Sequence, residues 1–132
     1  MSSHDIDTVR TAYAEFAAQN AGAVLAKLDP AAEWVEAGGG DSPCGTFVGP
    51  DAIAAGVFAV IGANFDEYRA DPSEFVDHGD RVVVTGRFTG RNKSGATLDT
   101  GFEHVFEMRD GKVVRFENRP ADAVAWAAGW TS

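Results

Sequence analysis

A histidine interrupts an apolar pattern near the C-terminal end of the sequence. The segment GFEHVFEMRDGKVVRFEN, residues 101–118, has the alternation of two strands joined by a tight turn. His104 shares its strand face with Phe102, Phe106 and Met108. An imidazole titrates near neutral pH and can move a proton, whereas a buried polar group without a partner costs about 1–3 kcal/mol. His104 is therefore either a pocket residue that meets a ligand, or a histidine with partners in the core or at a subunit interface.

The turn between these two strands decides which residues share the face of His104. A two-residue turn over residues 110–111 places His104 opposite Glu117, which mixes apolar with charged side chains. A three-residue loop over residues 109–111, with a glycine bulge, places His104 opposite Phe116 and separates the two kinds. We therefore predict the three-residue loop. Its inner face carries Phe102, His104, Phe106, Met108, Val114, Phe116 and Asn118. The imidazole and the amide of this face need a ligand, water or each other as partners.

A carboxylate in the first predicted strand is a second candidate for chemistry. In AAEWVEA, residues 31–37, alternation puts Trp34 and Glu36 on one side of the strand and Glu33 and Val35 on the other. If that side faces a cleft, burial beside a tryptophan raises the pKa of the Glu36 carboxyl toward a useful value. The alternatives are that Glu36 points into water at the end of the strand and that Trp34 belongs to the core.

The elements that must position these residues follow from the remaining pattern. Helical spacing predicts a helix over residues 5–19, a short helix that begins at Asn20 and ends at Asp29-Pro30, and a third over residues 50–68. Residues 38–49 are too rich in Gly, Pro and Ser to be regular. Further strands are predicted at residues 69–77, 81–91, 97–109 and 112–119, and a last helix, capped by Asp122, carries Val124, Trp126 and Trp130. This order indicates an α+β fold with helices on one face of a curved antiparallel sheet, which leaves a cleft for a small, largely apolar ligand.

Composition narrows the possible partners. The 132 residues suit a single domain over residues 1–132, and the formal charge of −9 without a basic cluster argues against nucleic acid and anionic membranes. No apolar stretch approaches the ~18 residues of a membrane span, and we expect no cleaved signal. The single Cys44 favours a reducing, cytoplasmic setting. His4, His78 and His104 are too scattered for a metal site.

Several segments together resemble a known family. The helix with Tyr13 and Phe16 and the segments AEWVEA, GTFVGPDAI, GDRVVVTGRFTG and HVFEMRDGKVVRF resemble SnoaL-like polyketide cyclases and ketosteroid-isomerase-related proteins of the NTF2-like superfamily, over about residues 6–126. The resemblance implies an NTF2-like cone, in which a curved antiparallel sheet and three to four helices enclose a hydrophobic pocket. It also implies a homodimer and chemistry without a cofactor.

The resemblance carries over to the candidate site only in part. In the SnoaL-like cyclases a histidine on the penultimate strand works with an acid on the last strand. His104 matches the histidine, but Asn118 occupies the place of the acid, and an amide is not a base. In the steroid isomerases the base lies near the end of the first strand, which Glu36 matches, and His104 takes the place of an oxyanion donor. Tyr13 lies one residue from the position of that family's oxyanion-binding tyrosine.

The sequence leaves three functions open. The first is a cofactor-free isomerase or cyclase that acts on a small hydrophobic carbonyl compound, with Glu36 as base and His104 and Asn118 as oxyanion donors. The second is a domain that binds a hydrophobic metabolite without catalysis, and the third is a dimerisation module. The aromatic residues expected to contact a ligand are Tyr13, Phe16, Trp34, Phe58, Phe88, Phe102, Phe106 and Phe116.

Overall fold

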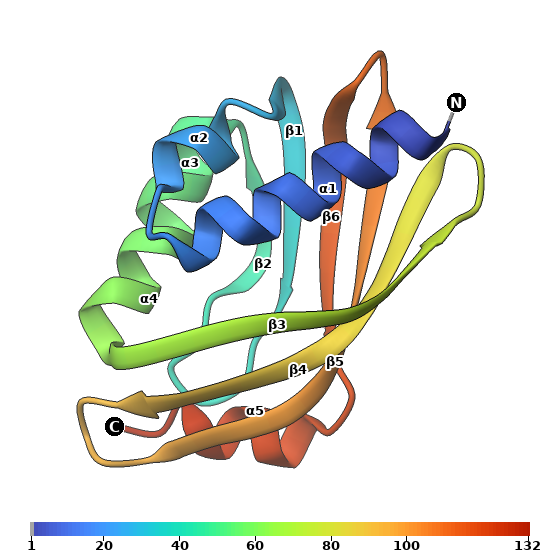
Figure 1. The fold of residues 1–132 in the computed structure, drawn as a ribbon. Coiled ribbons are helices and arrows are strands. Elements are labelled where there is room, and N and C mark those ends of the chain that lie inside the picture. The colour runs from blue at the N-terminus through green and yellow to red at the C-terminus, as the bar shows by residue number, and fades with distance from the viewer. Residues whose placement is uncertain (1) are drawn as a thin grey trace.

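A curved six-stranded sheet with helices on its concave side makes up the fold (Figure 1). The computed structural model describes residues 2–132. The helices are α1 (Ser2–Ala17), α2 (Ala21–Leu25), α3 (Pro50–Ile53), a π-helical stretch (Ala54–Phe58), α4 (Ala59–Asn64) and α5 (Ala123–Gly129). The strands are β1 (Leu28–Ala37), β2 (Cys44–Val48), β3 (Phe65–Asp77), β4 (Arg81–Asn92), β5 (Thr97–Arg109) and β6 (Lys112–Pro120). The α+β class is confirmed. None of the described helices is both long enough and apolar enough to cross a membrane.

The sheet has the strand order β2-β1-β6-β5-β4-β3, and it is mixed. Its β1–β6 pair is parallel, which departs from the purely antiparallel sheet that we expected, whereas the other neighbouring pairs are antiparallel. After β2 the chain crosses through α3 and α4 to the far edge, and the β3–β6 meander then returns it to β1. In Figure 1, α1 crosses in front of the sheet, α3 and α4 stand at one end of α1, and α5 lies under β4 and β5.

The β5–β6 turn differs from the predicted three-residue loop. Asp110 and Gly111 both have positive φ angles, 53° and 77°, and Arg109 pairs with Lys112. This is a two-residue turn whose twist matches that of the flanking strands, and an Asp-Gly pair suits it. The predicted loop, and with it the pairing of His104 with Phe116, is therefore wrong.

The extra residue that aligns the apolar faces lies inside β6. Met108 pairs with Val113 but Glu107 pairs with Arg115, so Val114 is a bulge. From there His104 pairs with Asn118, and both lie on the inner face. On that face Val113, which is buried, takes the place that we predicted for Val114.

Several element bounds also differ from the prediction. The segment expected to be irregular contains the edge strand β2, which pairs with β1. The third helix ends at Asn64, and the next residue begins β3 because it pairs with β4. Pro30 lies within β1, next to a break in its pairing with β6. The last helix, expected to carry Trp130, ends one residue before it at Gly129.

The predicted caps of α2 and α5 are confirmed. The side chain of Asn20 accepts a hydrogen bond from the backbone N–H of Ala23 at the start of α2. The carboxylate of Asp122 accepts bonds from the N–H groups of Val124 and Ala125 at the start of α5. Each cap satisfies backbone donors that the first turn of a helix leaves free.

Charged side chains cover the outer face of the sheet opposite the core. Arg115 on β6 lies within 4 Å of Glu33 on β1, Glu107 on β5 and Glu117 on its own strand. These alternate with inward residues such as Phe116, which is buried. The alternation makes inward residues such as Phe116 face the helices, whereas Val35 and Val105, which pair with Glu117, lie on the charged side of the sheet.

Candidate active site

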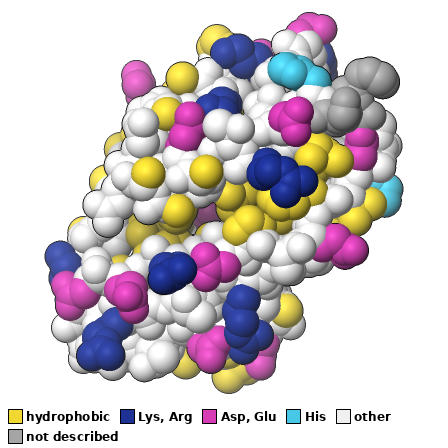
Figure 2. Space-filling view, in the orientation of Figure 1, with side chains coloured by type: hydrophobic (Ala, Val, Ile, Leu, Met, Phe, Trp, Pro, Cys, Tyr) yellow, Lys and Arg dark blue, Asp and Glu magenta, His cyan; other side chains and the backbone are white. Residues whose placement is uncertain are grey.

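A largely apolar cavity lies between the helices and the concave face of the sheet. It contains about 660 Å³ of space free of atoms, counted out to its open mouth. Figure 2 shows a hollow bordered by hydrophobic side chains, below α1 and above β3. The expected ligand-contacting aromatics that line the cavity are Tyr13, Phe16, Trp34, Phe58, Phe88, Phe106 and Phe116. An apolar cleft with few polar groups is the usual form of a small-molecule site.

Phe102 is the expected aromatic that does not reach the cavity wall. It is buried, and its ring stacks on the His104 ring with 3.9 Å between the centroids. Phe102 therefore supports the imidazole from the side and does not offer a surface to a ligand.

The three candidate catalytic residues lie together at the cavity wall. Asn118 Nδ2 donates to Glu36 Oε1 at 3.0 Å, and His104 Nε2 lies 3.0 Å from Asn118 Oδ1. The cavity borders all three residues. Glu36 comes from β1, His104 from β5 and Asn118 from β6, which lies between them in the sheet.

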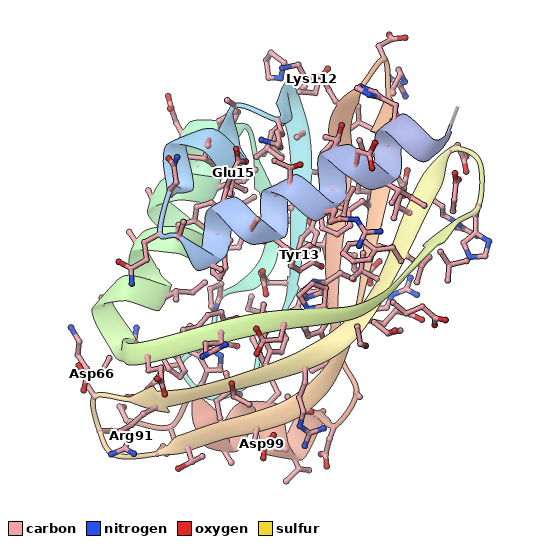
Figure 3. The ribbon with its side chains drawn as sticks, in the orientation of Figure 1. Tyr13, Glu15, Asp66, Arg91, Asp99 and Lys112 are labelled. Carbon is pink, nitrogen blue, oxygen red and sulfur yellow. The ribbon has the colours of Figure 1, made fainter. Side chains whose placement is uncertain are left out.

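Two further side chains extend this contact into a chain of five. Trp34 Nε1 donates to Glu36 Oε2 at 2.6 Å, which confirms that Trp34 and Glu36 share a face. At the other end the hydroxyl of Tyr13 lies 2.5 Å from His104 Nδ1. Figure 3 shows Tyr13 between α1 and the strands behind it. A helix and three strands of the sheet thus hold one polar network within an apolar wall.

The donors of this network all point toward Glu36. Because Asn118 donates its amide hydrogen to the carboxylate, its oxygen faces His104 and accepts from Nε2. A neutral imidazole with its hydrogen on Nε2 has a bare Nδ1, so the Tyr13 hydroxyl donates to it. Trp34 can only donate. Two series of hydrogen bonds therefore end at the Glu36 carboxylate. One runs from Tyr13 through His104 and Asn118, and the other is the single bond from Trp34.

Burial sets the protonation of the two titratable groups. Glu36 is 8% exposed, and its desolvation raises the pKa of the carboxyl to about 7 against the lowering effect of the bonds from Asn118 and Trp34. Desolvation lowers the pKa of His104 to about 3, although its bond to Asn118 opposes this. Near neutral pH, His104 is thus a neutral relay and Glu36 is the group that gains and loses a proton.

Of the two alternatives left open for Glu36, the structure shows the inward one, but the direct role of His104 is not supported by its contacts. Both ring nitrogens of His104 are occupied by Tyr13 and Asn118. Phe102 and Phe106 also pack against the ring. His104 holds Asn118 in the orientation that serves the carboxylate, and offers no free nitrogen to a ligand.

Sequence reasoning missed other residues of the wall. Tyr68 and Ala70 from β3 line the cavity, although Tyr68 was predicted to end a helix. Lys27 also lines it and forms an ion pair with Glu15. Figure 3 shows Glu15 on the side of α1 that faces α2. The strand alternation of Tyr68 and Ala70 was the available signal. Among residues 2–132, no group of three His, Cys, Asp or Glu residues could hold a metal ion.

Comparison with known proteins decides the family. The family model of the SnoaL-like domain matches residues 9–116, which is most of the chain. The chain belongs to the SnoaL-like domain family. No curated protein matches this SnoaL-like chain.

Solved structures show the same fold along the whole SnoaL-like chain. An NTF2-like protein of unknown function from Burkholderia pseudomallei is 29% identical, with full coverage of both chains and a TM-score of 0.90. TerC, co-crystallised with polyporic acid, is 31% identical over 98% of this chain and 99% of its own, with a TM-score of 0.86. Bal32a, from a soil-derived mobile gene cassette, is 27% identical over 98% of both chains, with a TM-score of 0.89. The NTF2-like architecture is therefore established.

Proposed function

We propose that this SnoaL-like domain is a cofactor-free enzyme that transfers a proton on a small hydrophobic carbonyl compound, as an isomerase or a cyclase. The observation that carries the proposal is the Glu36 carboxylate, which lies at an apolar cavity between two donors and has a pKa of about 7. A general base is most effective when its pKa lies near the working pH. TerC, which is similar to this chain and was co-crystallised with polyporic acid, supports an organic ligand in such a cavity.

The proposed reaction begins with Glu36. Its carboxylate removes a proton from a carbon next to the substrate carbonyl, and the electron pair of the broken C–H bond forms an enolate with the charge on oxygen. Where a C=C bond of the substrate is conjugated with the enolate, the protonated Glu36 returns the proton to the far carbon of that conjugated system, which shifts the double bond and gives an isomer. In the cyclase form, the enolate carbon instead attacks a second carbonyl of the same molecule, and that carbonyl oxygen takes the proton.

Trp34, Asn118 and His104 have positioning roles in this scheme. Trp34 and Asn118 each bind one oxygen of the carboxylate and so fix its plane. His104 keeps the Asn118 amide turned so that one of its N–H groups donates to Glu36. A base held by such bonds needs little rearrangement before the proton moves.

The experiment measures exchange of carbon-bound protons in D₂O by NMR, with 1-tetralone as a flat apolar ketone. Wild-type protein should exchange the protons next to the carbonyl at least about 100-fold faster than Glu36→Gln, the size expected of a general base. Glu33→Gln is the matched control, because Glu33 lies on the same strand but faces outward. Equal rates for wild type and Glu36→Gln would overturn the proposal.

A second candidate function is binding of a hydrophobic metabolite without catalysis. It is favoured by the contacts of His104 and Asn118, which satisfy each other and leave no last-strand acid. The same samples separate the two functions. Saturable shifts of protein resonances on addition of 1-tetralone, without proton exchange, would indicate a binding domain.

A further inference from the structure

Tyr68 is a polar group of the cavity wall that the Glu36 network does not use. It lies on β3, where it pairs with Gly90 of β4, and it lines the cavity. No hydrogen bond joins the Tyr68 hydroxyl to any other group of residues 2–132, whereas the Tyr13 hydroxyl is bonded to His104. One of the two tyrosine hydroxyls of the wall is thus committed within the protein, and the other is free to meet a ligand.

The ring of Tyr68 is fixed by its aromatic neighbours. Phe16 and Phe65 pack edge-on against it, with centroid distances of 6.0 and 5.1 Å. Phe88 and Trp130 contact it at 5.6 and 6.3 Å. A ring packed from α1, β3, β4 and the C-terminal end cannot turn its hydroxyl far, so the direction of this donor is set before a ligand arrives.

The charge of the base acts on the Tyr68 hydroxyl. Desolvation raises the pKa of Tyr68 well above its usual value, and the negative charge of Glu36 raises it further. The group therefore keeps its hydrogen at neutral pH and lies within electrostatic reach of the carboxylate. When the Glu36 carboxylate takes a proton, its negative charge passes to the substrate, and the Tyr68 hydroxyl is then a donor for that charge.

The chemistry proposed above requires a hydrogen-bond donor for the substrate oxygen. When Glu36 removes a proton, negative charge develops on the substrate oxygen, and an unpaired oxyanion in an apolar cavity is costly. Trp34, His104 and Tyr13 each direct their one hydrogen toward the base or toward one another, and Asn118 gives one of its two amide hydrogens to Glu36. We propose that Tyr68 is the catalytic residue that donates a hydrogen bond to the substrate oxyanion, and that the site accordingly favours flat compounds with an enolisable carbonyl or an acidic phenol. This inference rests on the proposed function.

The experiment uses two flat probes of similar size, 4-nitrophenol and nitrobenzene. Only the first can present an oxyanion, and its phenolate absorbs visible light, which reports the ionised fraction in the bound state. Both are titrated into Glu36→Gln, where a neutral amide replaces the base and stands in for its protonated form. The same titration is made with Tyr68→Phe and with Tyr13→Phe, each combined with Glu36→Gln, after thermal unfolding has shown that each variant is folded.

Tyr68→Phe should weaken 4-nitrophenolate binding about tenfold to hundredfold, the usual value of a hydrogen bond to a charged group. Its bound ionised fraction should fall, while nitrobenzene binding stays the same. Unchanged binding of both probes on Tyr68→Phe, or a loss confined to Tyr13→Phe, would overturn the assignment and leave the role of Glu36 intact. If Tyr68→Phe weakens 4-nitrophenolate binding but the wild-type protein does not exchange 1-tetralone protons, Tyr68 binds an oxyanion and the protein is not the proposed enzyme. If neither probe binds any variant, the assignment of Tyr68 falls, and the exchange of 1-tetralone protons decides the role of Glu36 separately.

Discussion

Replacing Asn118 by aspartate tests whether its amide serves the Glu36 carboxylate. Asn118 Nδ2 lies 3.0 Å from Glu36 Oε1, so Asn118→Asp places two carboxyl groups in contact. Two unit charges about 4 Å apart at an effective dielectric constant of about 20 repel by about 4 kcal/mol. That energy corresponds to about 3 pKa units. Because the pKa of Glu36 is about 7, the pair should release its last proton only near pH 10.

The sign of the effect on stability follows from counting protons. Between about pH 7 and pH 9, wild-type Glu36 has lost its proton, the folded variant keeps one shared proton, and the unfolded chains hold none. A folded state that binds more protons than the unfolded state loses stability as pH rises. The gap in the free energy of unfolding between wild type and Asn118→Asp should therefore grow by about 1.4 kcal/mol for each pH unit in this range.

The assay is urea unfolding near pH 7, 8 and 9. The control is the swapped variant Glu36→Gln with Asn118→Asp, which exchanges the acid and the amide and can keep the bonds to Trp34 and His104. The swapped variant again holds one carboxyl, so its gap to wild type should not grow with pH. A gap for Asn118→Asp that is equal near pH 7 and near pH 9 would show that the two side chains do not share a proton, and would refute the network.

Other perturbations test the base, the relay and the sheet. The raised pKa of Glu36 predicts that the free energy of unfolding of the wild type falls as pH rises from about 4.5 to about 7. Urea unfolding of Glu36→Gln should lack this slope. The rate of wild-type proton exchange on 1-tetralone should rise with pH to a plateau above about pH 7. His104→Phe leaves the Tyr13 hydroxyl and the Asn118 oxygen without their hydrogen-bond partner, so the free energy of unfolding in urea should fall by about 2–6 kcal/mol. A fall of less than about 1 kcal/mol would contradict the relay. Gly86→Ala sets a Cβ 2.3 Å from a backbone oxygen of β3 and should cost at least about 2 kcal/mol, whereas Gly62→Ala, in open space on α4, should gain up to about 1 kcal/mol by the same measurement.

Elements with local signals could be predicted from the sequence. Asn20 and Asp122 mark helix starts because their side chains bond to backbone groups two or three residues away. Trp34 and Glu36 share a face because every strand alternates. His104 and Asn118 were recognised as the polar pair of an apolar face even though the predicted turn was wrong, because the bulge at Val114 supplies the same extra residue.

Elements that depend on partners far away in the sequence could not be predicted from it. Phe65 and Tyr68 have a spacing of three, which fits a helix as well as the strand that they form with β4. The edge strand β2 exists because Phe47 pairs with Trp34, and Gly45 within it weakens the local strand signal. The error at Tyr68 mattered for function, because a residue assigned to a helix end was not considered for the cavity wall.

Because β1 and β6 are parallel, the site contains a carboxylate although the last strand carries Asn118 in place of an acid. Trp34 lies beside Phe116 and Val35 beside Glu117, so the next step along both strands brings Glu36 and Asn118 side by side. In the cyclases that the chain resembles, the acid is expected on the last strand. Here the same place in the cavity receives a carboxylate from the neighbouring strand, and the last strand supplies the amide that orients it. If β1 were antiparallel to β6, Glu36 and Asn118 would lie at opposite ends of the pair, and a last strand without an acid would leave the site without a carboxylate. In the parallel register the acid and the amide are neighbours, so exchanging them keeps one carboxyl in the site. The swapped variant should therefore show the wild-type response to pH.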